Sequence, residues 1–198
     1  MKEKNIIYII SLIAGSLTLE GLTLIALQIV FRNYMSIEIN VMTIAISIII
    51  ASIIYPYILL KRVYSVSKED LGITYCPVLS TVLLIGSIMC LGRILVLNNF
   101  SKSVIFIIIQ NLFVAIGEEF VARVCLFYLL RKIIKSEILI MIISTIIFVF
   151  IFHSNSSLMD NLVWRLPITM LLSFVYSKTN SIINCSILHM AYNVLVST

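Results

Sequence analysis

The run from Ser103 to Leu130 constrains the fold of this chain most, because it is 28 residues long and carries three charges near its middle. As an α-helix it would be ~42 Å long, which is enough to cross a ~30 Å hydrocarbon core. Its only charged residues are Glu118, Glu119 and Arg123. A lipid-facing charge at that depth costs roughly 2.5 to 3.5 kcal/mol. The run therefore predicts a membrane-spanning helix whose charges face a cavity lined by protein or water.

Helix geometry separates the two glutamates of this run. Glu119 and Arg123 are four residues apart on one helix face, with the acid nearer the N-terminus, so we expect them to neutralise each other. Glu118 lies ~100° around the helix from Glu119 and stays available for chemistry. The chain offers polar partners for it on other spans, namely His153, His189 and Asn193.

Composition indicates an all-α, polytopic transmembrane helix bundle. Of the 198 residues 61% are hydrophobic and only 12% are charged, which is too apolar for a soluble domain. No polar segment is long enough for a second domain, so residues 1–198 are predicted to form a single integral membrane domain. The net charge is +5, and the basic residues lie largely in short loops between the apolar runs. Their distribution therefore indicates the orientation of the spans in the membrane. We expect membrane lipid and a hydrophobic peptide or membrane-protein substrate as partners, not nucleic acid.

The apolar runs predict about seven membrane spans. The first shows no cleavage pattern and is expected to remain uncleaved, and Pro56 is expected to kink the second. Glu20, within the first span, is expected to face the bundle, where a structural, hydrogen-bonded role is favoured over that of a second functional carboxylate. The predicted spans are residues 6–31, 41–60, 77–97, 103–130, 137–152, 162–176 and 181–196.

The distribution of basic residues predicts the orientation in the membrane. With the N-terminus inside, nine Lys and Arg residues fall on the cytoplasmic side and four fall outside, which favours N-terminus in and C-terminus out. The nine are Lys2, Lys4, Lys61, Arg62, Lys68, Arg131, Lys132, Lys135 and Lys178. The four are Arg32, Arg93, Lys102 and Arg165.

Two chemistries fit these polar residues, and both hydrolyse a peptide bond in or at the membrane. In a metal-free route, Glu118 acts as general base on a water that His153 also holds, while His189 and Asn193, four residues apart on one face, stabilise the oxyanion. In a metal route, His153, His189 and a glutamate such as Glu118 bind zinc, which activates the water. The sequence leaves the two routes equally open.

The order of these motifs resembles the CPBP family of intramembrane proteases, which comprises CAAX prenyl endopeptidases and bacteriocin-processing proteins and is also called the Abi family. The shared elements are Glu118-Glu119-x-x-x-Arg123, then His153 after an aromatic-rich span, then His189-x-x-x-Asn193. They define a core at about residues 103–196, and Leu71-Gly72 is similar to a weaker family feature. The family usually has Phe four residues before the first His, where this chain has Val149, so we expect the aromatic packing to be displaced by one residue.

The resemblance implies roles for the matching residues. Glu118, His153, His189 and Asn193 would be catalytic, and Glu119 and Arg123 would support them. The expected activity is endoproteolysis of a small hydrophobic or membrane-associated peptide or protein, in bacteriocin or signal-peptide processing or in self-immunity. The Ile-rich composition and small size favour a protein of the bacterial cytoplasmic membrane. A prenylated substrate is not expected there.

Two other functions stay open. A non-catalytic membrane protein could confer immunity by binding a bacteriocin or its receptor, with the polar cluster holding the bundle together. A proton-coupled transporter could use buried Glu and His as a relay, but the sequence has neither inverted repeats nor paired broken helices. The oligomeric state is left open.

Overall fold

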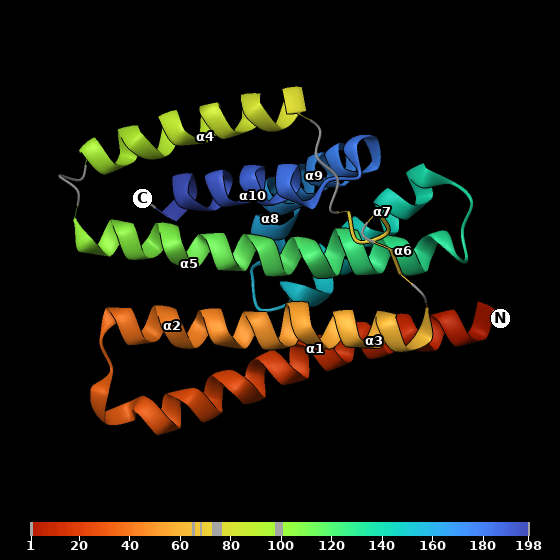
Figure 1. Ribbon diagram of the computed structural model, residues 1–198, viewed down its shortest axis with the longest axis horizontal. Coiled ribbons are helices and arrows are strands. Elements are labelled where there is room, and N and C mark those ends of the chain that lie inside the picture. Colours follow the sequence, from red (N-terminus) through yellow and green to blue (C-terminus); the bar gives the residue numbers. More distant parts are fainter. Residues whose placement is uncertain (1, 65, 68, 73–76, 98–100, 198) are drawn as a thin grey trace.

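Seven continuous helical segments build the part of the chain that the computed structural model describes, which is residues 2–64, 66–67, 69–72, 77–97 and 101–197. Within these residues there are no strands, and the predicted all-α bundle is confirmed (Figure 1). Four segments are long and apolar enough to cross a membrane, and three are shorter. Lys68, which was counted in the charge bias, lies outside the described residues.

The segments follow the predicted spans closely. The first is α1 (Lys2–Phe31), and the second joins α2 (Ile37–Ile48) to α3 (Tyr55–Val63). The third is α4 (Pro77–Leu97), and the fourth joins α5 (Lys102–Glu119) to α6 (Leu126–Arg131). The last three contain α7 (Glu137–Ile147), then α8 (Leu158–Asp160) with α9 (Leu166–Thr179), and finally α10 (Ile182–Ser197).

Serine caps explain why some helices begin before their apolar runs. Ser36 and Ser157 accept hydrogen bonds from backbone N–H groups three residues ahead, and α2 and α8 begin directly after them. The second and sixth helical segments therefore start at Ile37 and Leu158, each four residues earlier than the apolar pattern predicts (41 − 37 and 162 − 158). A capping oxygen satisfies a free N–H at the helix start, whatever the hydropathy of the first turn.

The helix that carries the charged stretch lies at the centre of the bundle. In Figure 1, α5 and α6 run between the α2–α3 helix and α10, while α4 covers the outer side of α10. Residues from Phe120 to Leu130 form about half of the main buried cluster, and Glu119 and Arg123 have no exposed side-chain surface. Large apolar side chains on α1 and α4 face outward, as lipid contact requires.

Four helical segments contain a π-helical stretch among the described residues. Two of these stretches, Ile49–Ile54 and Asn161–Arg165, directly precede the turn that contains Pro56 or Pro167. A proline ring clashes with the carbonyl four residues earlier, and widening the preceding turn relieves that clash. Just before Pro56, where a kink was predicted, the structure has a π-helical stretch within a continuous helical segment. The other two, Phe120–Cys125 and Phe148–Phe152, contain no proline.

Candidate active site

The Glu119–Arg123 pair forms the buried base of the site. Oε2 of Glu119 lies 3.2 Å from Nε of Arg123, and both side chains are fully buried, so the ion pair expected from their spacing is present. Arg123 also donates from Nη2 to the backbone oxygen of Thr169 on α9, at 3.0 Å. Its guanidinium carbon lies 5.0 Å from the ring centre of Phe148. The pair therefore ties three helical segments together.

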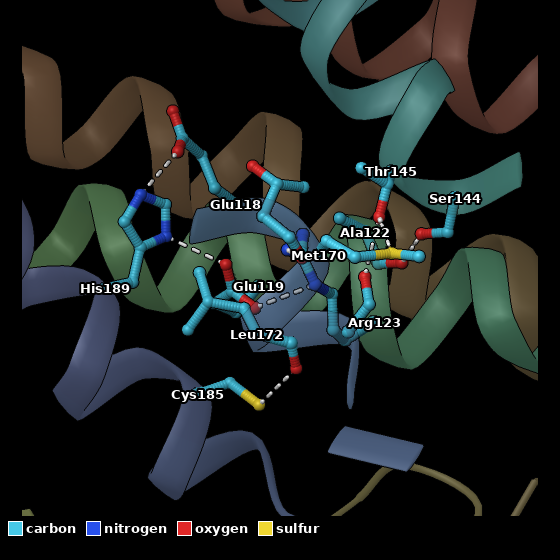
Figure 2. Close-up of polar contacts among 12 residues, drawn as sticks. Glu118, Glu119, Ala122, Arg123, Ser144, Thr145, Met170, Leu172, Cys185 and His189 are labelled. Carbon is cyan, nitrogen blue, oxygen red and sulfur yellow. Dashed lines mark hydrogen bonds and ion pairs between the residues drawn. The ribbon is translucent and has the colours of Figure 1, made fainter. Parts of the chain in front are cut away.

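His189 links the two glutamates, as Figure 2 shows. Its Nδ1 lies 2.8 Å from Oε1 of Glu119, and its Nε2 lies 3.5 Å from Oε2 of Glu118. A carboxylate beside a guanidinium can only accept a hydrogen bond, so we assign Nδ1–H as the donor to Glu119. This contact fixes the ring and aims Nε2 at Glu118.

Glu118 borders a cavity of about 170 Å³ between α5, α9 and α10. His153, His189 and Asn193 line the same cavity, so four of the six predicted site residues meet there. Glu119 and Arg123 lie behind it. The remaining lining residues are Val114, Phe148, Arg165, Ile168, Thr169, Leu172 and Tyr192.

Phe148 is the aromatic residue that packs against the two histidines. Its ring centre lies 4.9 Å from that of His153 and 6.3 Å from that of His189, edge-on in both cases. Phe148 precedes His153 by five residues, and a π-helical turn brings residues five apart into register. The predicted displacement of the aromatic position is therefore present, and its cause is the π-helical stretch Phe148–Phe152. Val149, at the family's Phe position, is also fully buried.

Counting residues from the start of each predicted span places the two histidines at different depths in the membrane. His153 follows the fifth helical segment, 16 residues after Glu137, whereas His189 is only eight residues after Ser181 (153 − 137 and 189 − 181). Tertiary packing nevertheless places both rings against Phe148 and along one cavity. A simple count of helical rise from each span's start therefore does not locate this site.

The two π-helical stretches without proline both border the site. Phe120–Cys125 follows Glu119 directly and contains Arg123, and Phe148–Phe152 ends at His153. Such stretches often occur at functional sites, and polar side chains can satisfy the backbone groups they free. Here Ser144 donates to the backbone oxygen of Ala122 at 2.8 Å, which ties α7 to the helix that carries the glutamates (Figure 2). Nothing in the residue types of these stretches signals a π turn.

The residues proposed for zinc do not form a set of metal ligands as they are arranged. Within the described ranges no three His, Cys, Asp or Glu side chains are grouped so that they could hold a metal ion. Both ring nitrogens of His189 face carboxylates instead. The zinc route therefore stays a prediction.

Sequence reasoning missed Arg165 and Tyr192 as site residues. Both line the 170 Å³ cavity and also an adjoining cavity of about 520 Å³, which Asn111, Asp160, Trp164, Asn193 and Val196 complete. Arg165 donates to Oδ1 of Asn161 at 3.3 Å, and Asn161 donates to the backbone oxygen of His153 at 3.1 Å. In the sequence, Arg165 was interpreted as a charge in an outer loop. Its position four residues after Asn161 was a usable signal, because residues four apart share a helix face.

Comparison with known families agrees with this geometry. Residues 100–195 match the family model described as type II CAAX prenyl endopeptidase Rce1-like. This segment is similar to the Rce1-like family. The match runs from just before α5 into the last turns of α10, so it includes all six predicted site residues, and the predicted family resemblance is confirmed. The Rce1-like match supports an intramembrane protease of the CAAX type. No curated protein and no solved structure matches the chain significantly.

Proposed function

We propose that the chain is an intramembrane endopeptidase that hydrolyses a peptide bond of a small hydrophobic or membrane-associated peptide. The observation that carries the proposal is the shared cavity, where Glu118, His153, His189 and Asn193 converge from three helical segments. The Rce1-like match of residues 100–195 supports the same reaction class. Bacteriocin leaders and signalling-peptide precursors are the substrates we favour.

In the proposed reaction Glu118 acts as general base. It takes a proton from a water molecule that His153 helps to hold, and the water oxygen attacks the scissile carbonyl carbon. A C–O bond forms, the C–N bond breaks, and the proton passes from Glu118 to the leaving amine. One water is consumed, and the products are a carboxylic acid and an amine.

His189 and Asn193 stabilise the oxyanion in this proposal. With Nδ1–H donated to Glu119, the role of His189 requires the doubly protonated ring, so that Nε2–H is also available as a donor. Glu119 and Arg123 orient the ring without touching the substrate. Removing one oxyanion donor typically lowers kcat by about 10²–10³-fold.

The testing experiment is cleavage of a membrane-peptide library by purified protein reconstituted in detergent. Wild type is compared with Glu118→Gln and His189→Ala, each with and without a chelator. Glu38→Gln is the matched control, because Glu38 is an exposed glutamate at the start of α2. We expect wild type and the control to cleave and the two site variants to lose at least about 100-fold in rate.

The other outcomes of the library experiment separate the alternatives. Chelator-sensitive cleavage would favour zinc at Glu118, His153 and His189, whereas insensitive cleavage would favour the glutamate route. Full cleavage by Glu118→Gln would refute the proposed base. If wild type cleaves no peptide and both variants still confer immunity in cells, the protein is a non-catalytic bacteriocin-immunity protein.

A further inference from the structure

A second cavity borders the proposed reaction site on the side of α1. It has a volume of about 260 Å³, and Glu118 and His153 line it together with residues of α1. The same two side chains line the 170 Å³ cavity, so they separate the two spaces. A peptide held against Glu118 could therefore place a side chain in this second cavity, which we call the Glu20 cavity. Its other lining residues are Leu17, Glu20, Gly21, Leu24, Ser52, Val121, Phe152 and Asn155.

Glu20 brings a carboxylate into this cavity without a partner among the described residues. No hydrogen bond or ion pair of its side chain is formed within that part of the chain. The nearby hydroxyls of Thr18 and Thr23 donate to the carbonyls of Ala14 and Leu19 in their own helix. The structural hydrogen bond expected for Glu20 is thus not found there. An acid within a membrane span is costly, so a cationic ligand would offset an otherwise unfavourable charge.

The walls of the Glu20 cavity suit a long cationic side chain. Leu17, Leu24, Val121 and Phe152 supply apolar surface, whereas Glu20 and Glu118 supply the carboxylates. Lysine and arginine bury their methylene stems against apolar surface and keep the charged head on polar groups. A bare metal ion fits less well, because no described group of three or more ligand side chains surrounds such a position.

A charge of the other sign lines the reaction cavity but not the Glu20 cavity. Arg165 lines both the reaction cavity and the 520 Å³ cavity beyond it. A cationic side chain of a bound peptide would be repelled from Arg165 and attracted toward Glu20. The charges of Glu20 and Arg165 therefore distinguish the two directions in which a peptide could lie.

We propose that the Glu20 cavity is a specificity subsite for a lysine or arginine side chain of the substrate, close to the scissile bond. The inference rests on the proposed protease function, and it assigns Glu20 a role in substrate recognition instead of in the reaction itself. Opposite charges brought together in a partly buried site raise affinity, so the effect should appear in KM.

The test uses a leucine–alanine transmembrane peptide that carries one lysine at successive positions on either side of the cleaved bond. Matched peptides carry norleucine, which keeps the stem but lacks the charge, or glutamate. We expect one lysine position to lower KM by about tenfold relative to norleucine, with kcat nearly unchanged. Glu20→Gln should remove this preference by raising the KM for the lysine peptide to that for the norleucine peptide, and Glu20→Asp should retain part of it. Thr18→Val, on an exposed position of α1, is the control and should keep the full preference.

Two results would overturn the subsite. One is an equal KM for the lysine and norleucine peptides at every position in wild type. The other is an equal loss of cleavage of both peptides by Glu20→Gln, with the fold shown intact by thermal unfolding. Binding of the same peptides to the His189→Ala protein separates this proposal from the protease function, because His189 does not line the Glu20 cavity. Lysine-selective binding that Glu20→Gln abolishes would support the subsite even if no peptide is cleaved.

Discussion

His189 and Glu119 are 70 residues apart in the chain, yet Nδ1 of the imidazole lies 2.8 Å from Oε1 of the carboxylate. Both side chains are buried, and the carboxylate is also paired with Arg123. The Glu119–Arg123 ion pair thus orients the imidazole ring of His189, whose other nitrogen faces Glu118. This arrangement resembles the way a buried carboxylate orients the histidine of a catalytic triad.

The buried ion pair makes Glu119 and Arg123 depend on each other. Glu119→Gln should lower the free energy of unfolding by about 3–5 kcal/mol, because Arg123 would keep an uncompensated buried charge. The double variant Glu119→Gln/Arg123→Gln should recover part of that loss. Unfolding in detergent micelles measures both. If the double variant is destabilised by the sum of the two single changes, the two side chains do not interact energetically.

The aromatic ring of Phe148 should be important for cleavage. Phe148→Leu removes the ring that packs on His153, His189 and Arg123, so we expect cleavage to fall by about tenfold. Phe174→Leu, at an exposed position of α9, is the control and should cleave as wild type does. Steady-state cleavage of one library peptide makes the comparison, and an unchanged rate for Phe148→Leu would contradict the packing argument.

Restoring the family's aromatic position should be harmful in this chain. Val149 is fully buried, so Val149→Phe would overpack its surroundings and lower the free energy of unfolding by about 1–3 kcal/mol. The π-helical stretch already brings Phe148 against His153. Thermal unfolding measures the change, and a more stable Val149→Phe protein would show that an aromatic side chain is accommodated there.

Gly117 allows the helix of the glutamates to pack closely on the second helical segment. A Cβ added at Gly117 would clash with Cγ2 of Ile48 and lie 3.2 Å from Cβ of Ser52. We expect Gly117→Ala to lower the free energy of unfolding by about 1–3 kcal/mol and to reduce cleavage by displacing Glu118.

Gly92 provides the matched control for that substitution. It also lies in a helix, but an added Cβ at Gly92 meets nothing within 4 Å among the described atoms. Gly92→Ala should therefore leave cleavage unchanged and be neutral or slightly stabilising, because alanine favours the helix. Equal effects of the two substitutions on unfolding and cleavage would disprove the close-packing explanation.

The charge bias predicts that the two chain ends lie on opposite sides of the membrane. In a protein whose native cysteines are replaced by serine, Glu3→Cys should react with an impermeant thiol reagent only from the cytoplasmic side. Leu195→Cys should react only from outside. Labelling of intact and opened cells checks this, and reaction of both cysteines from one side would require an even number of spans.

The sequence alone determined the helical bundle and the approximate spans, and it predicted the residues of the candidate site. Long apolar runs permit only helices in a bilayer, because each backbone polar group must be satisfied within its own segment. Spacing also predicted the Glu119–Arg123 pair, since residues four apart share a helix face. These features depend on local periodicity and hydropathy.

Only the tertiary structure decided how the residues meet. The contact of His189 with both glutamates, the packing of Phe148 on two histidines, and the cavities lined by Arg165 and Glu20 join segments distant in the chain. The π-helical stretches also escaped prediction, because apolar residues with ordinary helix propensity fill them. Helix rotation, depth and the placement of inward-facing polar groups depend on packing between helices, which hydropathy does not encode.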